Sequence, residues 1–242
     1  APLLRLDALS RHFGGLKVLQ DVTLDIARGG IFGLIGPNGA GKTTVFNLIT
    51  GLLAPTAGRI EFEGQPLTGR APYRITRLGL ARTFQNIRLF KEMTLLENVM
   101  VGLHAHLGYR AHDLILGTQR FRRAERSARE RADNLSYGDQ RKLELARALA
   151  TEPKLLLLDE PVAGMNSGEK DELMADVRRI SARGYTIFMI EHDMRFVMGL
   201  CERIAVLNFG RIIAEGGPDE IRNDPQVIEA YLGRDDDDGA PQ

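Results

Sequence analysis

The sequence has a single cysteine, Cys201, among its 242 residues. One thiol cannot build an internal disulfide framework, and scarce cysteine is typical of a reducing compartment, so we expect a cytoplasmic protein. An excess of charge is missing as well, because 32 lysines and arginines balance 32 aspartates and glutamates. This balance does not indicate a nucleic-acid surface, and we expect no nucleic-acid partner.

Long hydrophobic runs are also missing. The longest ones, KLLLLDEP and YTIFMIEH, have the length of a strand and end in polar residues. A membrane-spanning helix needs about 20 apolar residues, so no span is expected. The opening APLLRL is not a basic-then-apolar leader, and we expect no secretory signal. Apolar residues still make up 43% of the chain, which is enough for a substantial core.

The sequence does contain a regular alternation of strand and helix patterns. Its first part is rich in strand patterns, such as LLRLDAL, VTLDIA, IFGLIG and RIEFEG. Further on, the strands KLLLLDE and YTIFMIE alternate with helical segments, and RIAVLNFGRIIAEG has the pattern of a hairpin. The alternation predicts an α/β fold with a mostly parallel sheet covered by helices. Between about 86 and 133 only helices are expected, one of them starting at a capping box of Thr94 and Glu97.

A complete phosphate-binding motif follows the strand IFGLIG. GPNGAGKT, residues 36–43, matches the P-loop pattern G-x-x-x-x-G-K-[ST] and leads directly into the helix TTVFNLIT. Its glycines let backbone N–H groups converge on phosphate oxygens, and the helix start adds partial positive charge. Lys42 is expected to reach the β- and γ-phosphates, and Thr43 to bind Mg²⁺. The residues expected at the nucleotide are Asn38, Gly39, Ala40, Gly41, Lys42, Thr43 and Thr44. The alternative is an ordinary glycine-rich turn.

An acidic pair follows the four leucines of LLLLDEP. Asp159 and Glu160 come at the carboxyl end of a buried strand, where open α/β sheets bind ligands. We expect Asp159 to hold Mg²⁺ and Glu160 to deprotonate the attacking water. Gln85 and His192 follow two other apolar runs, so either could reach a γ-phosphate or its metal. Each of these residues taken alone is more simply explained as a polar cap or turn residue.

A second possible anion site is the helix start in NLSYGDQRKLELARAL, where Ser136 and Gly138 are expected to contact phosphate. One chain has no need of two sites for one nucleotide. We therefore predict that two chains pair head to tail, so that Ser136 and Gly138 of each contact the γ-phosphate held by the other's P-loop. The alternative is that this motif only caps a helix.

The order of these motifs resembles that in ATP-binding subunits of ABC transporters, over nearly the whole chain. ARTFQNIRLFKEMTLLENV, EPVAGMN, EHDM and DPQVIEAYLG look like the G-type ATPases of Liv importers, which take up branched-chain amino acids. The resemblance implies that Phe13 stacks on adenine and Val18 lines its pocket. It also implies that Gln85 is one of the residues of the metal site and couples that site to the membrane subunits. It further implies that His192 holds the γ-phosphate. An aromatic residue at a strand end is more often part of the core, which is the alternative for Phe13.

The family resemblance also implies the organisation of the chain. We expect one ABC ATPase domain over 1–242. Residues 1–86 and 142–242 would form a RecA-like P-loop core with an antiparallel β-subdomain. Residues 87–141 would form an inserted helical subdomain that contains the signature motif.

The sequence departs from the family pattern in three places. Tyr137 and Asp139 replace a glycine and the glutamine of the common signature, and Asp139 is placed to act as a capping-box acid. Asn166 stands where most relatives have aspartate, although Liv-type subunits share it. Relatives also have about twenty more residues, including a helix, before the signature. Either the lobe is shortened, or a segment near 131–134 is left out of the numbering, and we favour the second because losing a helix would uncover its neighbours.

These observations predict an ATPase that uses ATP and Mg²⁺ to drive uptake of amino acids, with branched-chain ones as the expected solutes. The expected partners are a second ABC ATPase subunit, two integral-membrane permease subunits and, indirectly, an extracytoplasmic amino-acid-binding protein. The expected location is the cytoplasmic face of the inner membrane, with a soluble chain in isolation. The alternatives are an importer ATPase for another solute and a soluble ABC ATPase without a transport role.

Overall fold

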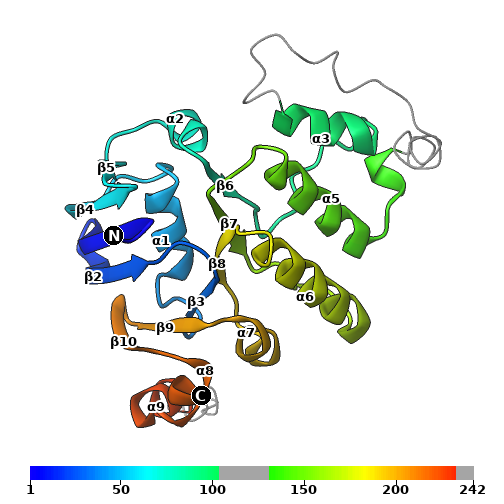
Figure 1. Ribbon diagram of the computed structural model, residues 1–242. Coiled ribbons are helices and arrows are strands. Elements are labelled where there is room, and N and C mark those ends of the chain that lie inside the picture. The colour runs from blue at the N-terminus through cyan, green and yellow to red at the C-terminus, as the bar shows by residue number, and fades with distance from the viewer. Residues whose placement is uncertain (104–130, 233–242) are drawn as a thin grey trace, which may run out of the picture.

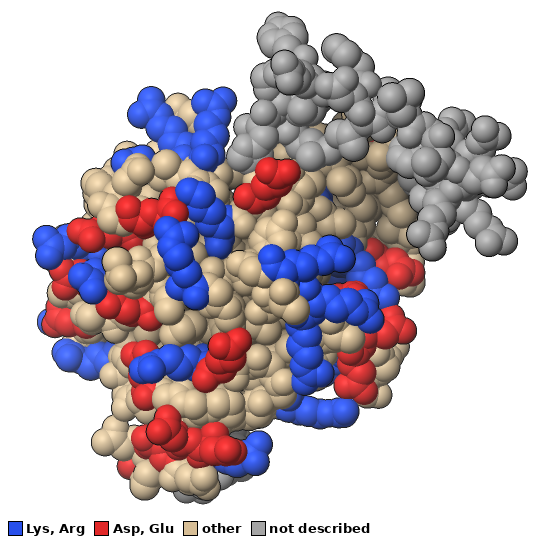
Figure 2. Space-filling model, in the orientation of Figure 1, with Lys and Arg blue, Asp and Glu red and all other residues tan. Residues whose placement is uncertain are grey.

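The computed structural model describes residues 1–103 and 131–232 (Figure 1, Figure 2). Most of the expected charged helix RFRRAERSARERA and the acidic tail RDDDDGAPQ lie outside the described residues. In the described part of the chain, no helix has both the length and the apolar character that crossing a bilayer requires.

The larger sheet has six strands in the order β10-β9-β3-β8-β7-β6. Its strands are β3 (Ile31–Ile35), β6 (Leu80–Arg82), β7 (Leu155–Asp159), β8 (Thr186–Ile190), β9 (Arg203–Asn208) and β10 (Arg211–Gly216). The strands from β9 to β6 pair in parallel, and β10 pairs antiparallel with β9. The expected mostly parallel sheet and the expected hairpin are therefore confirmed.

The smaller sheet is antiparallel, with the order β2-β1-β4-β5. Its strands are β1 (Leu4–Phe13), β2 (Leu16–Ile26), β4 (Ala57–Phe62) and β5 (Gln65–Pro66). All of them come from the N-terminal part of the chain, as the sequence predicted. Figure 1 shows this sheet beside helix α1 (Lys42–Ile49).

The larger sheet is buried on both faces, because successive side chains of a strand point to opposite sides. Leu155 and Leu157 of β7 pack with Phe46 of α1 and with the smaller sheet. Leu156 and Leu158 pack on the other face with α6 (Ser167–Ser181) and α7 (Met194–Leu200). The continuous run of leucines is therefore explained by a strand that has no solvent-facing side.

The remaining helices are α2 (Pro72–Arg77), α3 (Leu95–Leu103), α5 (Tyr137–Leu149), α8 (Pro218–Asn223) and α9 (Pro225–Leu232), with a short 3₁₀ turn, η2 (Ala132–Asn134). Helix α3 packs closely against α5, since a β-carbon on Gly102 would collide with the backbone carbonyl of Arg147. The predicted capping box is present: Thr94 N–H donates to Glu97 at 2.8 Å, and Glu97 N–H donates to Thr94 Oγ1 at 3.2 Å.

The junction before the signature helix runs without a break from Arg131 to Leu135. Asn134 N–H donates to Arg131 O at 3.1 Å, and Ala132 N–H donates to Met93 O at 3.1 Å. Glu130 and the residues before it lie outside the described part. The two explanations of the short junction, a shortened lobe and a segment left out of the numbering, therefore both stay predictions.

Candidate nucleotide site

The P-loop connects β3 to α1, and two of its glycines, Gly36 and Gly41, have no room for a side chain. Gly41 has a φ of 108°, and a β-carbon there would lie 2.8 Å from Leu19 Cδ2. A β-carbon on Gly36 would collide with the Leu207 carbonyl oxygen of β9. The first turn of α1 contains no acidic residue, so the positive end of its dipole is left for an anion.

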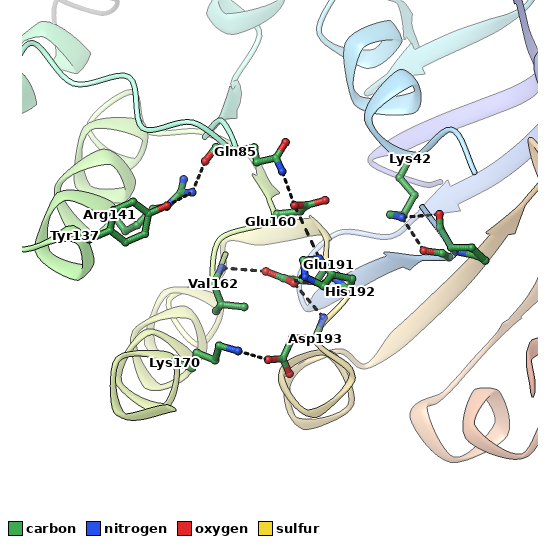
Figure 3. Close-up of polar contacts among 12 residues, drawn as sticks. Lys42, Gln85, Tyr137, Arg141, Glu160, Val162, Lys170, Glu191, His192 and Asp193 are labelled. Atoms are coloured by element: carbon green, nitrogen blue, oxygen red, sulfur yellow. Dashed lines mark hydrogen bonds and ion pairs between the residues drawn. The ribbon is translucent and has the colours of Figure 1, made fainter. Parts of the chain in front are cut away.

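A hollow of about 410 Å³ lies over this loop. It is lined by Val18, Asn38, Gly39, Gly41, Lys42, Thr43, Thr44 and Glu160. The Lys42 side chain is buried and folds back, so that Nζ donates to Gly36 O at 2.7 Å and to Pro37 O at 3.0 Å (Figure 3). Ala40 is buried in the core behind the loop. The structure thus places six of the seven predicted P-loop residues around one cavity.

The two residues expected at adenine differ in position. Val18 lines the hollow, whereas Phe13 lies outside its lining at the end of β1. The Phe13 side chain is 43% exposed, with the Arg11 guanidinium 4.4 Å from its ring centroid. The alternative explanation of Phe13 as a core residue is therefore wrong.

Asp159 lies at the carboxyl end of β7, as the sequence predicted, and its carboxylate is buried. The sequence did not indicate its partner, Arg82, whose Nη2 lies 2.7 Å from Asp159 Oδ2. Arg82 Nη1 also donates to Asn47 Oδ1 of α1 and to Oγ1 of Thr50, the C-cap of that helix, at 2.8 and 3.2 Å. The only sequence signal was an arginine inside the apolar run LGLARTF. Arg82 thus joins the strand that holds Asp159 to the helix that begins at the P-loop.

Glu160, Gln85 and His192 come from three separate strand ends and meet in Figure 3. Gln85 Nε2 donates to Glu160 Oε2 at 2.8 Å, and His192 Nδ1 lies 3.9 Å from the same oxygen. Glu160 has a φ of 47°, a left-handed conformation that costs energy for a residue with a β-carbon. Such strain, on a residue that lines the hollow, is typical of a functional site.

The residues expected to hold Mg²⁺ fit the chemistry of that ion. A threonine hydroxyl at Thr43, a carboxylate at Asp159 and an amide at Gln85 are oxygen donors of the kind that Mg²⁺ prefers. Because Gln85 Nε2 is bonded to Glu160, its amide oxygen is the atom available to a metal. Bound there, Mg²⁺ would neutralise charge on the β- and γ-phosphates.

The signature segment begins helix α5, and Ser136 is its N-cap. Asp139 N–H donates to Ser136 Oγ at 3.2 Å, and the Ser136 hydroxyl donates to Asp139 Oδ2 at 2.8 Å. The capping role predicted for Asp139 therefore takes a different form, in which its carboxylate accepts from a hydroxyl instead of from N–H groups. Gly138 is buried, and a β-carbon there would lie 2.8 Å from Glu169 Oε1.

Helix α6 explains the departure at Asn166. The Asn166 side chain accepts from Glu169 N–H at 3.0 Å, while Glu169 accepts from Asn166 N–H at 2.9 Å, which completes a capping box. Asparagine is among the preferred N-cap residues, so the replacement of aspartate is conservative here.

Two buried residues of α5 that the sequence did not indicate hold the segment around Gln85. Arg141 donates to the backbone carbonyls of Phe84 and Gln85 and, at 3.0 Å, to the Tyr137 hydroxyl. Glu144 accepts from Phe84 N–H at 3.3 Å and pairs with Arg141 at 3.3 Å. Burial raises the pKa of the Glu144 carboxyl.

Comparisons with known proteins show the family to which this chain belongs. The chain matches the family model described as ABC transporter over residues 19–163. A second model, described as branched-chain amino acid ATP-binding cassette transporter, matches residues 211–237. The chain therefore belongs to the ABC transporter family of ATP-binding cassettes, and it is an ATPase.

Individual relatives cover nearly the whole chain. The high-affinity branched-chain amino acid transport ATP-binding protein LivG of Escherichia coli (strain K12) is 46% identical over 252 positions, covering 96% of this chain and 98% of LivG. That coverage is about 232 residues of this chain, so LivG has residues at about twenty positions where this chain has none. Whether those positions lie before the signature stays a prediction.

Solved structures give the same fold. The ADP conformation of an ATP-binding cassette of an ABC transporter has a TM-score of 0.83 and 32% identity, with 97% of this chain and 100% of that chain covered. A dimeric bacterial ABC transporter cassette has a TM-score of 0.76 and 26% identity, with 89% and 98% covered. The predicted P-loop fold class is therefore confirmed.

Proposed function

We propose that this chain is the ATP-hydrolysing subunit of an importer for branched-chain amino acids. The observation that carries the proposal is the meeting of the P-loop and Glu160 at one hollow, with Gln85 and His192 both reaching Glu160. In this proposal Glu160 deprotonates the attacking water and His192 holds the γ-phosphate. Thr43, Asp159 and Gln85 hold Mg²⁺, and Phe13 stacks on adenine.

The role of Glu160 is tested by Glu160→Gln. ATP binding should be kept while the hydrolysis rate falls by roughly 10²–10⁴-fold, the usual contribution of a general base. Glu152→Gln, at an exposed position, is the matched control and should hydrolyse ATP at the normal rate. Near-normal hydrolysis by Glu160→Gln would remove this residue from the role.

Two such chains, or this chain and a related cassette, would pair head to tail. Helix α5, which starts at the signature, packs through Leu145 on one face of the larger sheet, and α1 packs through Phe46 on the other. This separation favours Ser136 and Gly138 serving the nucleotide of a partner chain, and the dimeric relative supports pairing. Binding of ATP between the chains would favour the closed pair, and hydrolysis would release it.

A mixing experiment tests the pairing. Ser136→Arg chains and Lys42→Ala chains should each be inactive alone, because each damages one half of every composite site. Mixed dimers should recover hydrolysis, since one of their two sites then has both halves intact. No recovery in demonstrated mixed dimers would show that Ser136 does not act on the partner's nucleotide.

A groove between the Gln85 segment and α3 suits docking of the permease subunits. It has a volume of about 430 Å³, and its lining includes Phe84, Arg88, Phe90, Val101 and Arg147. Phe90 and Val101 are exposed at 47% and 39%. A permease docked in the groove of each chain of the pair would place the ATPases on the cytoplasmic face of the inner membrane, below an extracytoplasmic binding protein. In this proposal the chain in isolation would be soluble.

The name of LivG and the second family model favour branched-chain amino acids as the cargo. The test is uptake of labelled leucine by a strain without this gene and by the same strain carrying it. Leucine uptake should be lost in the strain without the gene and restored in the strain that carries it. Excess unlabelled isoleucine or valine should compete with labelled leucine for uptake. Unchanged leucine uptake would favour another solute or a role outside transport.

A further inference from the structure

Glu191 is a carboxylate buried at the centre of the site, directly before His192. It directly follows the last residue of β8, and its side chain is completely buried. Among the described residues, the basic side chain that lies beside it is His192, with Nδ1 3.9 Å from Glu191 Oε2. Nearby Lys170 pairs instead with Asp193, at 2.6 Å. A buried carboxylate is costly unless hydrogen bonds satisfy it.

Three backbone N–H groups satisfy Glu191, and they belong to two different loops (Figure 3). Glu191 Oε1 accepts from Val162 N–H at 3.0 Å. Oε2 accepts from His192 N–H at 2.9 Å and from Asp193 N–H at 3.2 Å. Burial raises the pKa of this carboxyl, and these N–H groups act in the opposite direction. One side chain therefore ties the loop after Glu160 to the loop that contains His192.

The hydrogen bond between Val162 and Glu191 lies close to the strained residue Glu160. Glu160 N–H donates to Ile190 O at 2.9 Å, which holds the N-terminal side of the left-handed conformation. The bond from Val162 N–H to Glu191 holds the chain two residues further on. A left-handed conformation persists only where its surroundings enforce it. These two bonds enclose the turn that aims the Glu160 carboxylate into the hollow.

We infer that Glu191 is a positioning residue for ATP hydrolysis, which sets the distance between Glu160 and His192 by holding both of their loops. This inference rests on the proposed roles of those two residues. Glu191 itself would contact neither the phosphate nor the attacking water. Hydrolysis depends on such geometry, because a misplacement of about 1 Å can reduce a rate by about 10²-fold.

Two substitutions distinguish the effect of the hydrogen bonds between the two loops from the effect of the negative charge. Glu191→Gln keeps the shape, but an amide has one acceptor oxygen and one NH₂ group, so an N–H group on one side loses its acceptor. Glu191→Asp keeps the charge and can still accept from the adjacent N–H groups of His192 and Asp193. Its side chain is one methylene shorter, so the bond to Val162 should be lost.

The experiment compares both variants with the wild type and with Glu220→Gln, a control at a carboxylate that accepts from Gly217 N–H at the start of α8. For each protein, ATP affinity and the number of binding sites are measured without hydrolysis, and the hydrolysis rate is expressed per site. Amide hydrogen exchange is followed in the segment 161–165. Glu160→Gln is measured beside them.

The expected result for both Glu191 variants is a rate per site lowered about 10- to 100-fold. ATP affinity should stay within about threefold of the wild type, and exchange in 161–165 should be faster. A purely structural role would lower the number of sites and leave the rate per site unchanged, and that result would overturn the inference. A proportional loss of affinity and rate would also overturn it.

If Glu191→Gln fails to fold, Glu191→Asp decides the question, because it retains the buried charge. A normal rate per site in folded Glu191→Asp refutes the positioning role. A normal rate in Glu160→Gln would instead refute the proposed role of Glu160, so the two failures are distinguishable.

Discussion

Arg82 and Asp159 form a buried ion pair, and loss of either partner should destabilise the protein. The two side chains are 5% and 4% exposed and lie 2.7 Å apart. Replacing Arg82 with Met keeps most of the volume and apolar contact but leaves Asp159 without its counter-charge. Asn47 and Thr50 lose a hydrogen-bond donor at the same time. Removing one partner of a buried pair costs about 3–5 kcal/mol, because an uncompensated charge stays buried.

An exposed ion pair of the same type provides the control. Arg5 and Asp25 lie 2.9 Å apart, but each side chain is 48% exposed. Water and salt screen such a pair, so Arg5→Met should lower the free energy of unfolding far less than Arg82→Met does. The free energy of unfolding is measured for both variants by urea denaturation followed by circular dichroism.

A double variant identifies the cause. Arg82→Met combined with Asp159→Asn leaves no buried charge, so it should be more stable than Arg82→Met alone. A loss below about 1 kcal/mol in Arg82→Met would refute the argument. Equal losses in the single and double variants would show that lost packing, and not charge, is the cause.

Three further predictions concern single sites. Lys42→Ala should bind ATP roughly 10- to 100-fold more weakly by calorimetry, because it deletes a charge-assisted phosphate contact. Lys91→Ala, at an exposed position, should bind ATP with normal affinity. Equal affinities of the two variants would refute the role of the P-loop lysine in phosphate binding. Burial raises the pKa of Cys201 to about 12, so Ellman's reagent at pH 8 should react with it only after unfolding, and rapid reaction of the native protein would contradict this burial. The hydrogen bond from Lys170 lowers the pKa of Asp193 below 3.8, so its stabilising contribution is present above that pH and lost as the pH falls through the lowered pKa. Asp193→Asn should therefore show a smaller loss of stability between pH 5 and pH 2 in urea titrations, and an identical loss would refute the pairing.

The sequence by itself determined the features that depend on near neighbours in the chain. The P-loop was recognisable because its glycines, lysine and threonine lie within eight residues between a strand and a helix. The capping box at Thr94 and Glu97 spans one helical turn, and its hydrogen bonds are those predicted. Four leucines in succession predicted a strand buried on both faces. In each case the pattern is short, and the physical cause is local backbone geometry.

Only the tertiary structure decided which polar groups share the buried interior. Arg82 and Asp159 are 77 residues apart and meet because β6 and β7 are neighbours in the sheet. Glu191 reaches Val162 across 29 residues, and Arg141 reaches the carbonyl of Phe84 across 57. A glutamate at a strand end has the same sequence signal whether it faces water or closes a buried network. Its partner depends on strand order and on how each loop folds back, and these follow from packing of the whole core.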